Sequence, residues 1–268
     1  MVLIGRYGEI FLKGKNRLNF EKRLVENIKQ MFGVGVLRKR NRILVNDDVN
    51  LKRIFGLISF SPAVEVDLRM EKIKEIVLDL VKKEKFESFA VSTKRMSTNF
   101  EFNSQQVNEL IGEFVLENFD KKVDLSHPDL TIGIEMIDNR AYIFTKTFDC
   151  FGGLPVGVEG KVGLLIEDGG SILAGLLMMK RGCDLVVFSY EDTGLDLLQK
   201  YSSKKLELKK IQEKELLNEF LIKEKCLALV TGEKEEFKDW NIDLPVLKPL
   251  VAYDQKEIEK MLTKFENE

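Results

Sequence analysis

The sequence predicts a chain of mixed α/β and α+β class whose last part is a doubly wound, parallel-sheet unit. In residues 161–188 an apolar run, a glycine turn, an apolar helix-forming stretch and a second apolar run follow one another directly. That order and length are typical of a βαβ unit. Two alternating runs, 130–135 and 141–145, flank Asp138-Asn139-Arg140, which is typical of an antiparallel hairpin. We therefore expect more than one α/β unit.

Size and composition predict a globular chain with two or more domains. The 268 residues are 44% hydrophobic and 32% charged. No apolar run approaches about 18 residues, so we expect no membrane span, and the N-terminus lacks a signal-peptide pattern. Cys150, Cys183 and Cys226 are far apart and form no metal motif. We expect no disulfide framework, no metal and a cytoplasmic location.

Charge is distributed unevenly along the chain. Residues 1–60 hold 13 Lys and Arg against 5 Asp and Glu, residues 61–150 hold 12 against 17, and residues 151–268 hold 17 against 22. A basic block on an acidic body predicts a polyanionic partner, and we favour nucleic acid over the alternative of a solvated, thermophile-like surface.

The first 60 residues predict a small α/β unit. We expect a strand at 1–4, a second short piece at 9–12, a basic turn at 13–17 and a helix at 19–32, where apolar residues recur at helical spacing. Basic residues 38–42 precede a strand at 43–45. Both basic segments are candidate phosphate contacts, which would set affinity and register without choosing sequence.

Residues 57–150 predict a second α/β unit. Residues 60–66 are expected to be a linker that runs into a strand, an amphipathic helix follows at 70–83, and Lys94 and Arg95 come after a strand at 89–92. Ser104 is the expected cap of a helix that ends near residue 118. The hairpin described above completes this unit.

The third unit begins after a glycine-proline hinge at 151–157, which we take as a domain boundary. Its glycine turn opens onto a helix N-terminus, where α/β proteins place phosphates. Glu167 and Asp168 lie in that turn, and carboxylates there cap a helix but repel phosphate. The residues favour a capped turn over a nucleotide loop. A strand at 226–230 and a last helix capped by Asp254 follow.

Six segments match, in order, the motifs of one known family. They are Arg6–Arg17, Phe60–Ala63, Gly152–Gly157, Leu177–Gly182, Leu229–Glu233 and Leu244–Leu250. The chain thereby resembles the tRNA 4-thiouridine synthase (tRNA sulfurtransferase) family, which in bacteria is also tied to thiamine biosynthesis. The resemblance implies a ferredoxin-like N-terminal domain at 1–60, a THUMP domain at 61–150 that binds the tRNA acceptor end, and a PP-loop ATP-pyrophosphatase domain at 151–268.

The chain departs from the family at the PP-loop, where the family pattern is Ser-Gly-Gly-x-Asp-Ser. The aligned residues are Ile166 to Ser171, and only Ser171 agrees. Residues 234–240 are shorter and more acidic than the family's Ser/Gly/Gln-rich loop, and no cysteine lies between Cys183 and Cys226. We therefore expect a shortened, degenerate PP-loop domain, in which Gly169, Gly170 and Ser171 are the candidate nucleotide contacts.

Two functions follow from the resemblance. The first is a tRNA-binding protein without catalysis, with no catalytic residue and no cofactor expected. Its candidate tRNA contacts are Arg6, Lys13, Lys15, Arg17, Lys22, Arg23, Lys94 and Arg95. The second is an active sulfurtransferase that uses ATP and magnesium to adenylate a uridine and then transfers sulfur from a donor. A catalytic paralogue or a sulfur donor is a candidate partner, and a homodimer a candidate assembly. We favour the first.

Overall fold

A computed structural model describes residues 1–96, 100–213, 216–234 and 240–268. The chain forms two compact units, which interleave along the sequence. The first comprises Met1–Arg6, Val34–Val49 and Ser59–Asp149, and the second comprises Tyr7–Gly33, Asn50–Ile58 and Cys150–Glu268. Within the described residues no helix is long and apolar enough to span a membrane. The linear division at residues 60 and 150 stays a prediction.

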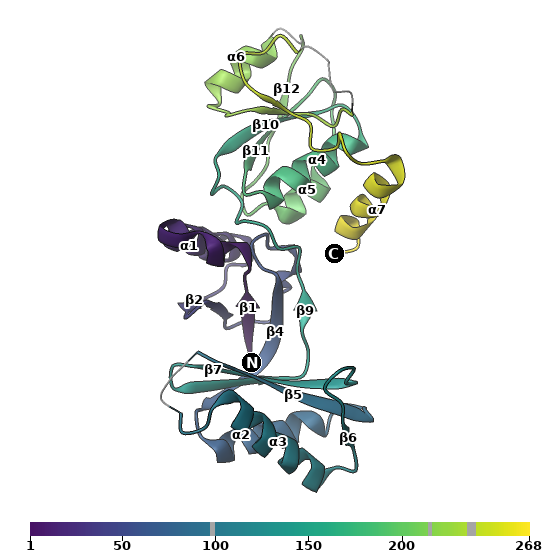
Figure 1. Ribbon diagram of the computed structural model, residues 1–268. Coiled ribbons are helices and arrows are strands. Elements are labelled where there is room, and N and C mark those ends of the chain that lie inside the picture. The colour runs from purple at the N-terminus through teal and green to yellow at the C-terminus, as the bar shows by residue number, and fades with distance from the viewer. Residues whose placement is uncertain (97–99, 214–215, 235–239) are drawn as a thin grey trace. The chain divides into compact units, whose positions relative to one another are not determined.

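The first unit is built on a nine-stranded sheet (Figure 1). Its strands are β1 (Val2–Arg6), β2 (Val36–Lys39), β3 (Arg42–Val45), β4 (Ser59–Asp67), β5 (Ser88–Arg95), β6 (Lys122–Val123), β7 (Leu130–Ile137), β8 (Arg140–Phe144) and β9 (Phe148–Asp149). They lie in the order β2-β3-β1-β4-β8-β7-β5-β6, with β9 beside β4. β5 runs parallel to β6 and β7, and the other pairs are antiparallel.

Residues 60–66, predicted as a linker that runs into a strand, belong to β4 throughout, so the linker part of that prediction is wrong. Pro62 pairs with Leu3 of β1, and β4 pairs with β9 only up to Phe60 and with β8 only from Val64. Proline lacks an N–H and is tolerated in a strand where one side is unpaired. Pro62 lies at such a gap, so β4 continues through it.

Two helices, α2 (Met70–Val81) and α3 (Ser104–Asn118), cover one face of the sheet around β5 and β7 (Figure 1). The predicted apolar faces form the core here, with Ile73, Val77, Val107 and Ile111 all fully buried. The predicted cap at Ser104 is off by one residue. Asn103 caps α3 because its side chain accepts from the backbone of Gln106 in a reciprocal capping box.

The second unit contains a five-stranded, fully parallel sheet. Its strands are β10 (Lys161–Ile166), β11 (Asp184–Ser189), β12 (Leu208–Lys210), β13 (Leu229–Val230) and β14 (Val246–Leu247), in the order β12-β11-β10-β13-β14. The α-helices are α1 (Arg17–Phe32), α4 (Gly169–Lys180), α5 (Asp196–Tyr201), α6 (Leu216–Lys223) and α7 (Gln255–Glu266). Short 3₁₀ helices are η1 (Glu9–Leu12), η2 (Gly14–Asn16) and η3 (Leu51–Arg53), so the short piece at 9–12 is helical.

This sheet is covered on both faces. Helices α4, α5 and α7 share one apolar core with Leu164 of β10, whereas α6 packs with Leu165 in the core on the other face. Successive strand residues point to opposite faces, so β10 is buried on both sides, as its continuous apolar run predicts. The predicted fold class, with its doubly wound parallel sheet, is confirmed.

The glycine-proline segment predicted as a hinge is held in place by the backbone. Leu154 N donates to Lys180 O (2.9 Å), Gly157 N donates to Gly182 O (2.8 Å), and Gly152 exchanges bonds with residues 56 and 57. A Cβ on Gly153, whose φ is +77°, would lie 2.2 Å from Lys180 O. The segment therefore docks tightly on the end of α4, and glycine is required there for close approach.

Candidate nucleic-acid interface and nucleotide turn

The candidate tRNA contacts of the second unit lie at or next to η2 and on α1, and they differ in whether the protein already pairs them. Lys15 and Lys22 are exposed, and neither has a hydrogen bond or ion pair within the described residues. Lys13 pairs with Glu159 (3.3 Å), and its ammonium lies 4.7 Å from the ring centre of Phe20. Lys15 and Lys22 are thus the cations that a phosphate reaches without displacing a protein partner.

Arg17 and Arg23 are already paired. Arg17 donates to the Glu21 carboxylate (2.7 Å) and to the Tyr7 hydroxyl (3.0 Å), and Arg23 lies 3.7 Å from Glu26. Burial, and then the bond to Glu21, raise the pKa of Tyr7 to about 12. Tyr7 therefore stays protonated and Arg17 stays charged over the physiological range, and Arg17 fixes the start of α1 as well as adding positive charge.

In the first unit the structure brings two basic segments together. Lys94 is exposed on β5. Its neighbour Arg95 is half-buried and donates to the carbonyls of residues 100 and 102. Arg40, in the β2–β3 turn, donates to Met96 O (3.1 Å) and to Asp138 (2.8 Å), and Lys39 also bonds Asp138 (3.0 Å). The hairpin therefore lies against the end of β5.

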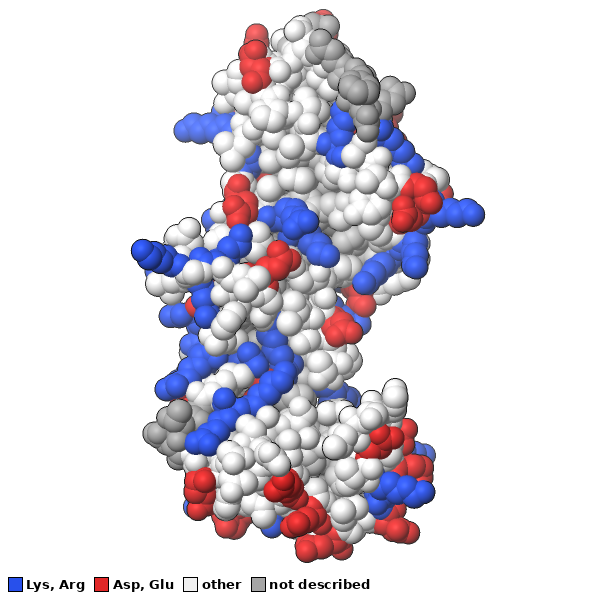
Figure 2. Space-filling model, viewed as in Figure 1, with Lys and Arg blue, Asp and Glu red and all other residues white. Residues whose placement is uncertain are grey.

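We call this set the hairpin patch. It consists of Arg38, Lys39, Arg40, Lys94 and Arg95. Figure 2 shows Lys and Arg side chains gathered in a band over the part of the first unit that carries β2. Asp138 neutralises only part of this charge. The hydrogen bonds from Lys39 and Arg40 lower the pKa of Asp138, and burial, which would raise it, is too weak to reverse that shift. The patch is a cationic surface suited to phosphate contacts.

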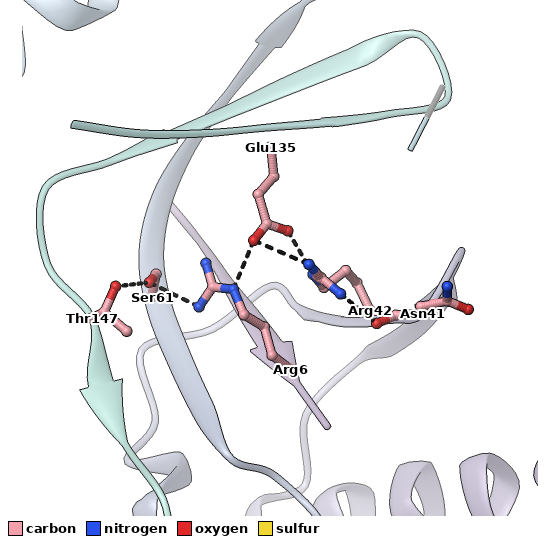
Figure 3. A network of polar contacts seen from close by, with 6 residues as sticks. All are labelled: Arg6, Asn41, Arg42, Ser61, Glu135 and Thr147. Atoms are coloured by element: carbon pink, nitrogen blue, oxygen red, sulfur yellow. Dashed lines mark hydrogen bonds and ion pairs between the residues drawn. The ribbon is translucent and has the colours of Figure 1, made fainter. Parts of the chain in front are cut away.

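Arg6, predicted to contact tRNA, has a structural role instead (Figure 3). Its side chain is 9% exposed and donates to Glu135 (2.7 Å) and to Ser61 (3.1 Å), and Ser61 in turn bonds Thr147 (2.9 Å). Arg42 donates to the same Glu135 carboxylate at 2.6 Å. Arg6 and Arg42, both basic in sequence, are therefore removed from the candidate phosphate contacts.

The buried carboxylate at the centre of this network remains ionised. Glu135 is 1% exposed, and burial alone would raise its pKa. The hydrogen bonds and charges of Arg42 and Arg6 outweigh burial and hold the pKa of Glu135 below its usual range. The network ties β1 and β3 to β7 and orients the strand ends from which the hairpin patch projects.

At the predicted nucleotide turn the protein supplies its own anion. Asp168 is the N-cap of α4, and its Oδ1 accepts from the backbone N–H of Ser171 (2.9 Å) and from the Ser171 hydroxyl (3.0 Å). The same hydroxyl accepts from the backbone N–H of Glu167 (3.2 Å). Ser171 is 1% exposed, so its hydroxyl is used inside the turn. Of the three predicted nucleotide contacts, only Gly169 has open space around it, because a Cβ on Gly170 would lie 3.2 Å from Asp168 Oδ1.

A cavity of about 600 Å³ nevertheless lies beside the turn, at the carboxyl ends of β10 and β13. Its lining includes Asp168, Gly169, Gly170, Gly232, Glu233, Lys234, Gln255, Ile258 and Leu262. This is the edge of a parallel sheet where ligands bind. Part of the acidic segment noted in the sequence, residues 235–239, lies outside the described residues.

The chain's thiols are poorly suited to sulfur chemistry. Burial raises the pKa of Cys226 to about 11 and also raises the pKa of Cys183, while Cys150 is half-buried with its Sγ 3.6 Å from Leu51 O. Only the thiolate is nucleophilic, so the two buried thiols are inert near neutral pH. Over residues 1–96, 100–213, 216–234 and 240–268, no group of three His, Cys, Asp or Glu could hold a metal ion.

Two family models match the first part of the chain. Residues 2–61 match a ThiI ferredoxin-like domain, and residues 69–146 match a THUMP domain.

Several curated proteins described as probable tRNA sulfurtransferases are similar in sequence. The protein from Alkaliphilus oremlandii is 32% identical, over 99% of this chain and 84% of its own length. The protein from Methanocaldococcus jannaschii is 30% identical, over 97% of this chain and 87% of its own length, in an alignment of 334 positions. The Mycoplasmopsis synoviae protein is 40% identical, but the match spans 66% of this chain and only 48% of that protein.

Two solved structures have a similar fold over nearly the whole chain. The protein PH1313 of Pyrococcus horikoshii is 28% identical with a TM-score of 0.89, and the match covers 99% of both chains. A 4-thiouridine synthetase, solved as an RNA complex with bound ATP, is 27% identical with a TM-score of 0.85. That match covers 98% of this chain and 84% of the synthetase.

Proposed function

The chain belongs to the tRNA sulfurtransferase family, and we propose that it binds the acceptor end of tRNA without carrying out ATP-dependent thiolation. The division into a ferredoxin-like domain at 1–60, a THUMP domain at 61–150 and a shortened PP-loop domain at 151–268 is part of this proposal. A related 4-thiouridine synthetase binds RNA and ATP, so the two halves of the proposal call for separate tests.

The RNA half of the proposal is supported by cations that have no competing partner. Lys15 and Lys22 in the second unit and Lys94 in the first are exposed and unpaired within the described residues. Each such side chain that neutralises a phosphate releases condensed counterions, which drives binding and makes it sensitive to salt. The hairpin patch adds a local cluster of positive charge, although Lys39 and Arg40 in it are paired with Asp138.

One observation supports the proposed loss of catalysis: the carboxylate of Asp168 caps the N-terminus of α4. A nucleotide phosphate at that terminus would have to displace this carboxylate or lie beside it. Two like charges about 4 Å apart at an effective dielectric constant of about 20 repel by roughly 4 kcal/mol. The Ser171 hydroxyl is also engaged, and the buried thiols offer no nucleophile for sulfur transfer.

Fluorescence anisotropy with labelled, unmodified tRNA tests the RNA half. We expect binding whose affinity falls steeply with salt, and we expect the triple variant Lys15→Glu/Lys22→Glu/Lys94→Glu to abolish it. A matched control changes the exposed lysines at the end of α2, Lys82, Lys83 and Lys85, to Glu, with the same change in net charge. Equal affinity of the two triple variants would refute this assignment of contacts.

Calorimetry with ATP and magnesium, with and without tRNA, tests the catalytic half. We expect clear heat of tRNA binding and no heat with ATP, because Asp168 occupies the anion position. Micromolar ATP binding would contradict the proposal and favour an active enzyme.

The alternative is an active sulfurtransferase that uses ATP and magnesium, with sulfur supplied by a separate donor protein or catalytic paralogue. Its support is the 600 Å³ cavity beside the turn and the Thr231 hydroxyl just after β13, which is buried without a partner within the described residues. It predicts tRNA-dependent exchange of pyrophosphate into ATP. Absence of exchange at saturating ATP and magnesium would exclude adenylation by this chain alone.

A further inference from the structure

Four of the six family-like segments meet at a second cavity of about 640 Å³ in the second unit. Glu9 comes from the first segment, Gly153 from the glycine-proline segment, Lys180 and Arg181 from the end of α4, and Lys248 from the segment after β14. The remaining lining residues are Leu177, Met178, Leu247, Pro249 and Tyr253. The two nucleotide-sized cavities share no lining residue. Lys180 and Asp168 lie at opposite ends of α4, which is about 18 Å long.

The position of Lys180 at this cavity is fixed by the backbone. A Cβ on Gly153 would lie 2.2 Å from the Lys180 carbonyl oxygen and 2.7 Å from its Cγ, and Leu154 N donates to that carbonyl. The glycine-proline segment thus packs closely against the end of α4 and is hydrogen-bonded to it. This tight packing fixes the backbone of Lys180 at the cavity.

Two of the three cations at this cavity, Lys180 and Arg181, are not paired with a carboxylate of the described residues. Lys180 and Arg181 have no ion pair or side-chain hydrogen bond within the described part of the chain. Burial, and then the charge of Lys264, lower the pKa of Lys180, while Glu9, the only acid among the lining residues, raises it. The helix dipole at the end of α4 offsets part of the repulsion between Lys180 and Lys264. An anionic ligand would offset the rest.

The lining of the cavity also includes apolar side chains and one aromatic ring. Leu177, Met178 and Pro249 line the cavity together with half-buried Tyr253. Aromatic side chains beside a basic groove are how proteins hold unstacked bases, because every base has a face that stacks. Lys248 also lines the cavity and is paired with Glu233 at 3.4 Å.

We propose that this cavity binds one unstacked nucleotide of an RNA strand, with its phosphate at Lys180 and Arg181 and its base against Tyr253. The inference rests on the proposed function, because it takes RNA as the ligand. A free nucleotide carries the same chemistry, so the experiment separates the two sources.

The test measures tRNA affinity of Lys180→Glu/Arg181→Glu by anisotropy over a range of salt. We expect affinity about tenfold or more weaker than wild type, with a salt slope shallower by about two. Tyr253→Ala, which keeps the charges, is expected to weaken binding about fivefold or more with an unchanged slope.

The matched control is Lys82→Glu/Lys83→Glu, which changes two consecutive exposed lysines at the end of a helix. Circular dichroism and thermal unfolding verify that every variant folds.

A second readout maps the base directly. Ultraviolet irradiation of the wild-type complex with tRNA, followed by mass spectrometry, is expected to find uridine or cytidine crosslinked to the tryptic peptide that carries Tyr253. Wild-type affinity of both variants, or absence of this crosslink, would overturn the inference while leaving RNA binding intact. If wild type does not bind tRNA, the proposed function itself fails. If the variants lose binding of AMP but keep tRNA affinity, the site belongs to a free nucleotide and the RNA assignment is wrong.

Discussion

Replacing Glu135 by Gln removes the charge at the centre of the buried network while nearly keeping the shape of the side chain. Glu135 is 1% exposed, and its two partners, Arg6 and Arg42, are 9% and 12% exposed. Removing one member of a buried ionic group leaves the rest uncompensated, which costs about 3 to 5 kcal/mol. We expect the lower end, about 3 kcal/mol, because the Gln carbonyl still accepts one hydrogen bond.

Asp138→Asn is the matched control for this variant. Asp138 also accepts from two cations, Lys39 and Arg40, but its side chain is 38% exposed. Asn tolerates the φ of +54° found there, so the backbone is not strained. Exposed pairs contribute little, and we expect a loss below about 1 kcal/mol. Urea unfolding measures both variants, and hydrogen exchange at the amides of β1, β3 and β7 localises the effect to the first unit.

The same comparison has a defined pH dependence. The pKa of Glu135 is lowered on folding, so its contribution is present above the ordinary carboxyl pKa of 4.5 and is lost as pH falls through the folded value. The stability difference between wild type and Glu135→Gln should therefore be full at pH 7 and shrink below about pH 4.5. Equal destabilisation by Glu135→Gln and Asp138→Asn, or a difference that grows on acidification, would refute the assigned role of the network.

Two further predictions concern the second unit. A Cβ on Gly232 would lie 2.5 Å from the backbone nitrogen of Ser171, whereas one on Gly169 meets nothing within 4 Å. Gly232→Ala should thus destabilise by about 2 kcal/mol and Gly169→Ala hardly at all, and similar melting temperatures would contradict this packing. For the thiols, a pKa of about 11 leaves roughly one Cys226 in a thousand ionised at pH 8, so a thiol reagent should modify Cys150 first. Fast labelling of Cys226 in the folded protein would show that it is accessible and activated.

Much of the fold could be predicted from the sequence because it depends on local patterns. The apolar period of residues 70–81 and 104–118 places two helices, and the run–turn–helix–run of 161–188 places the parallel βαβ unit. The capped turn was also predictable, since the bonds between Asp168 and Ser171 span three residues. The error at Pro62 arose because the neighbouring strands decide the local structure there.

The candidate site was harder to predict because its members are far apart in the chain. Sequence patterns indicated which residues are basic and which segments are family-like, but they did not show which basic side chains are buried. Arg6 and Lys15 appear equally basic in sequence, yet one is bonded to Glu135, 129 residues away, and the other is exposed. The hairpin patch could not be predicted from the sequence either, because the bond from Arg40 to Met96 O, just after β5, joins residues that are far apart in the chain.

The sequence by itself therefore determined the elements, the turn chemistry at Asp168 and the basic composition of the N-terminal segment. Those properties follow from periodicity, helix capping and charge, which act over a few residues. Only the tertiary structure decided which cations remain free, that the glycine-proline segment is clamped on α4, and that four segments share one cavity. These depend on which distant side chains become neighbours when the sheets form, since burial and pairing fix whether a charge faces a protein carboxylate or solvent.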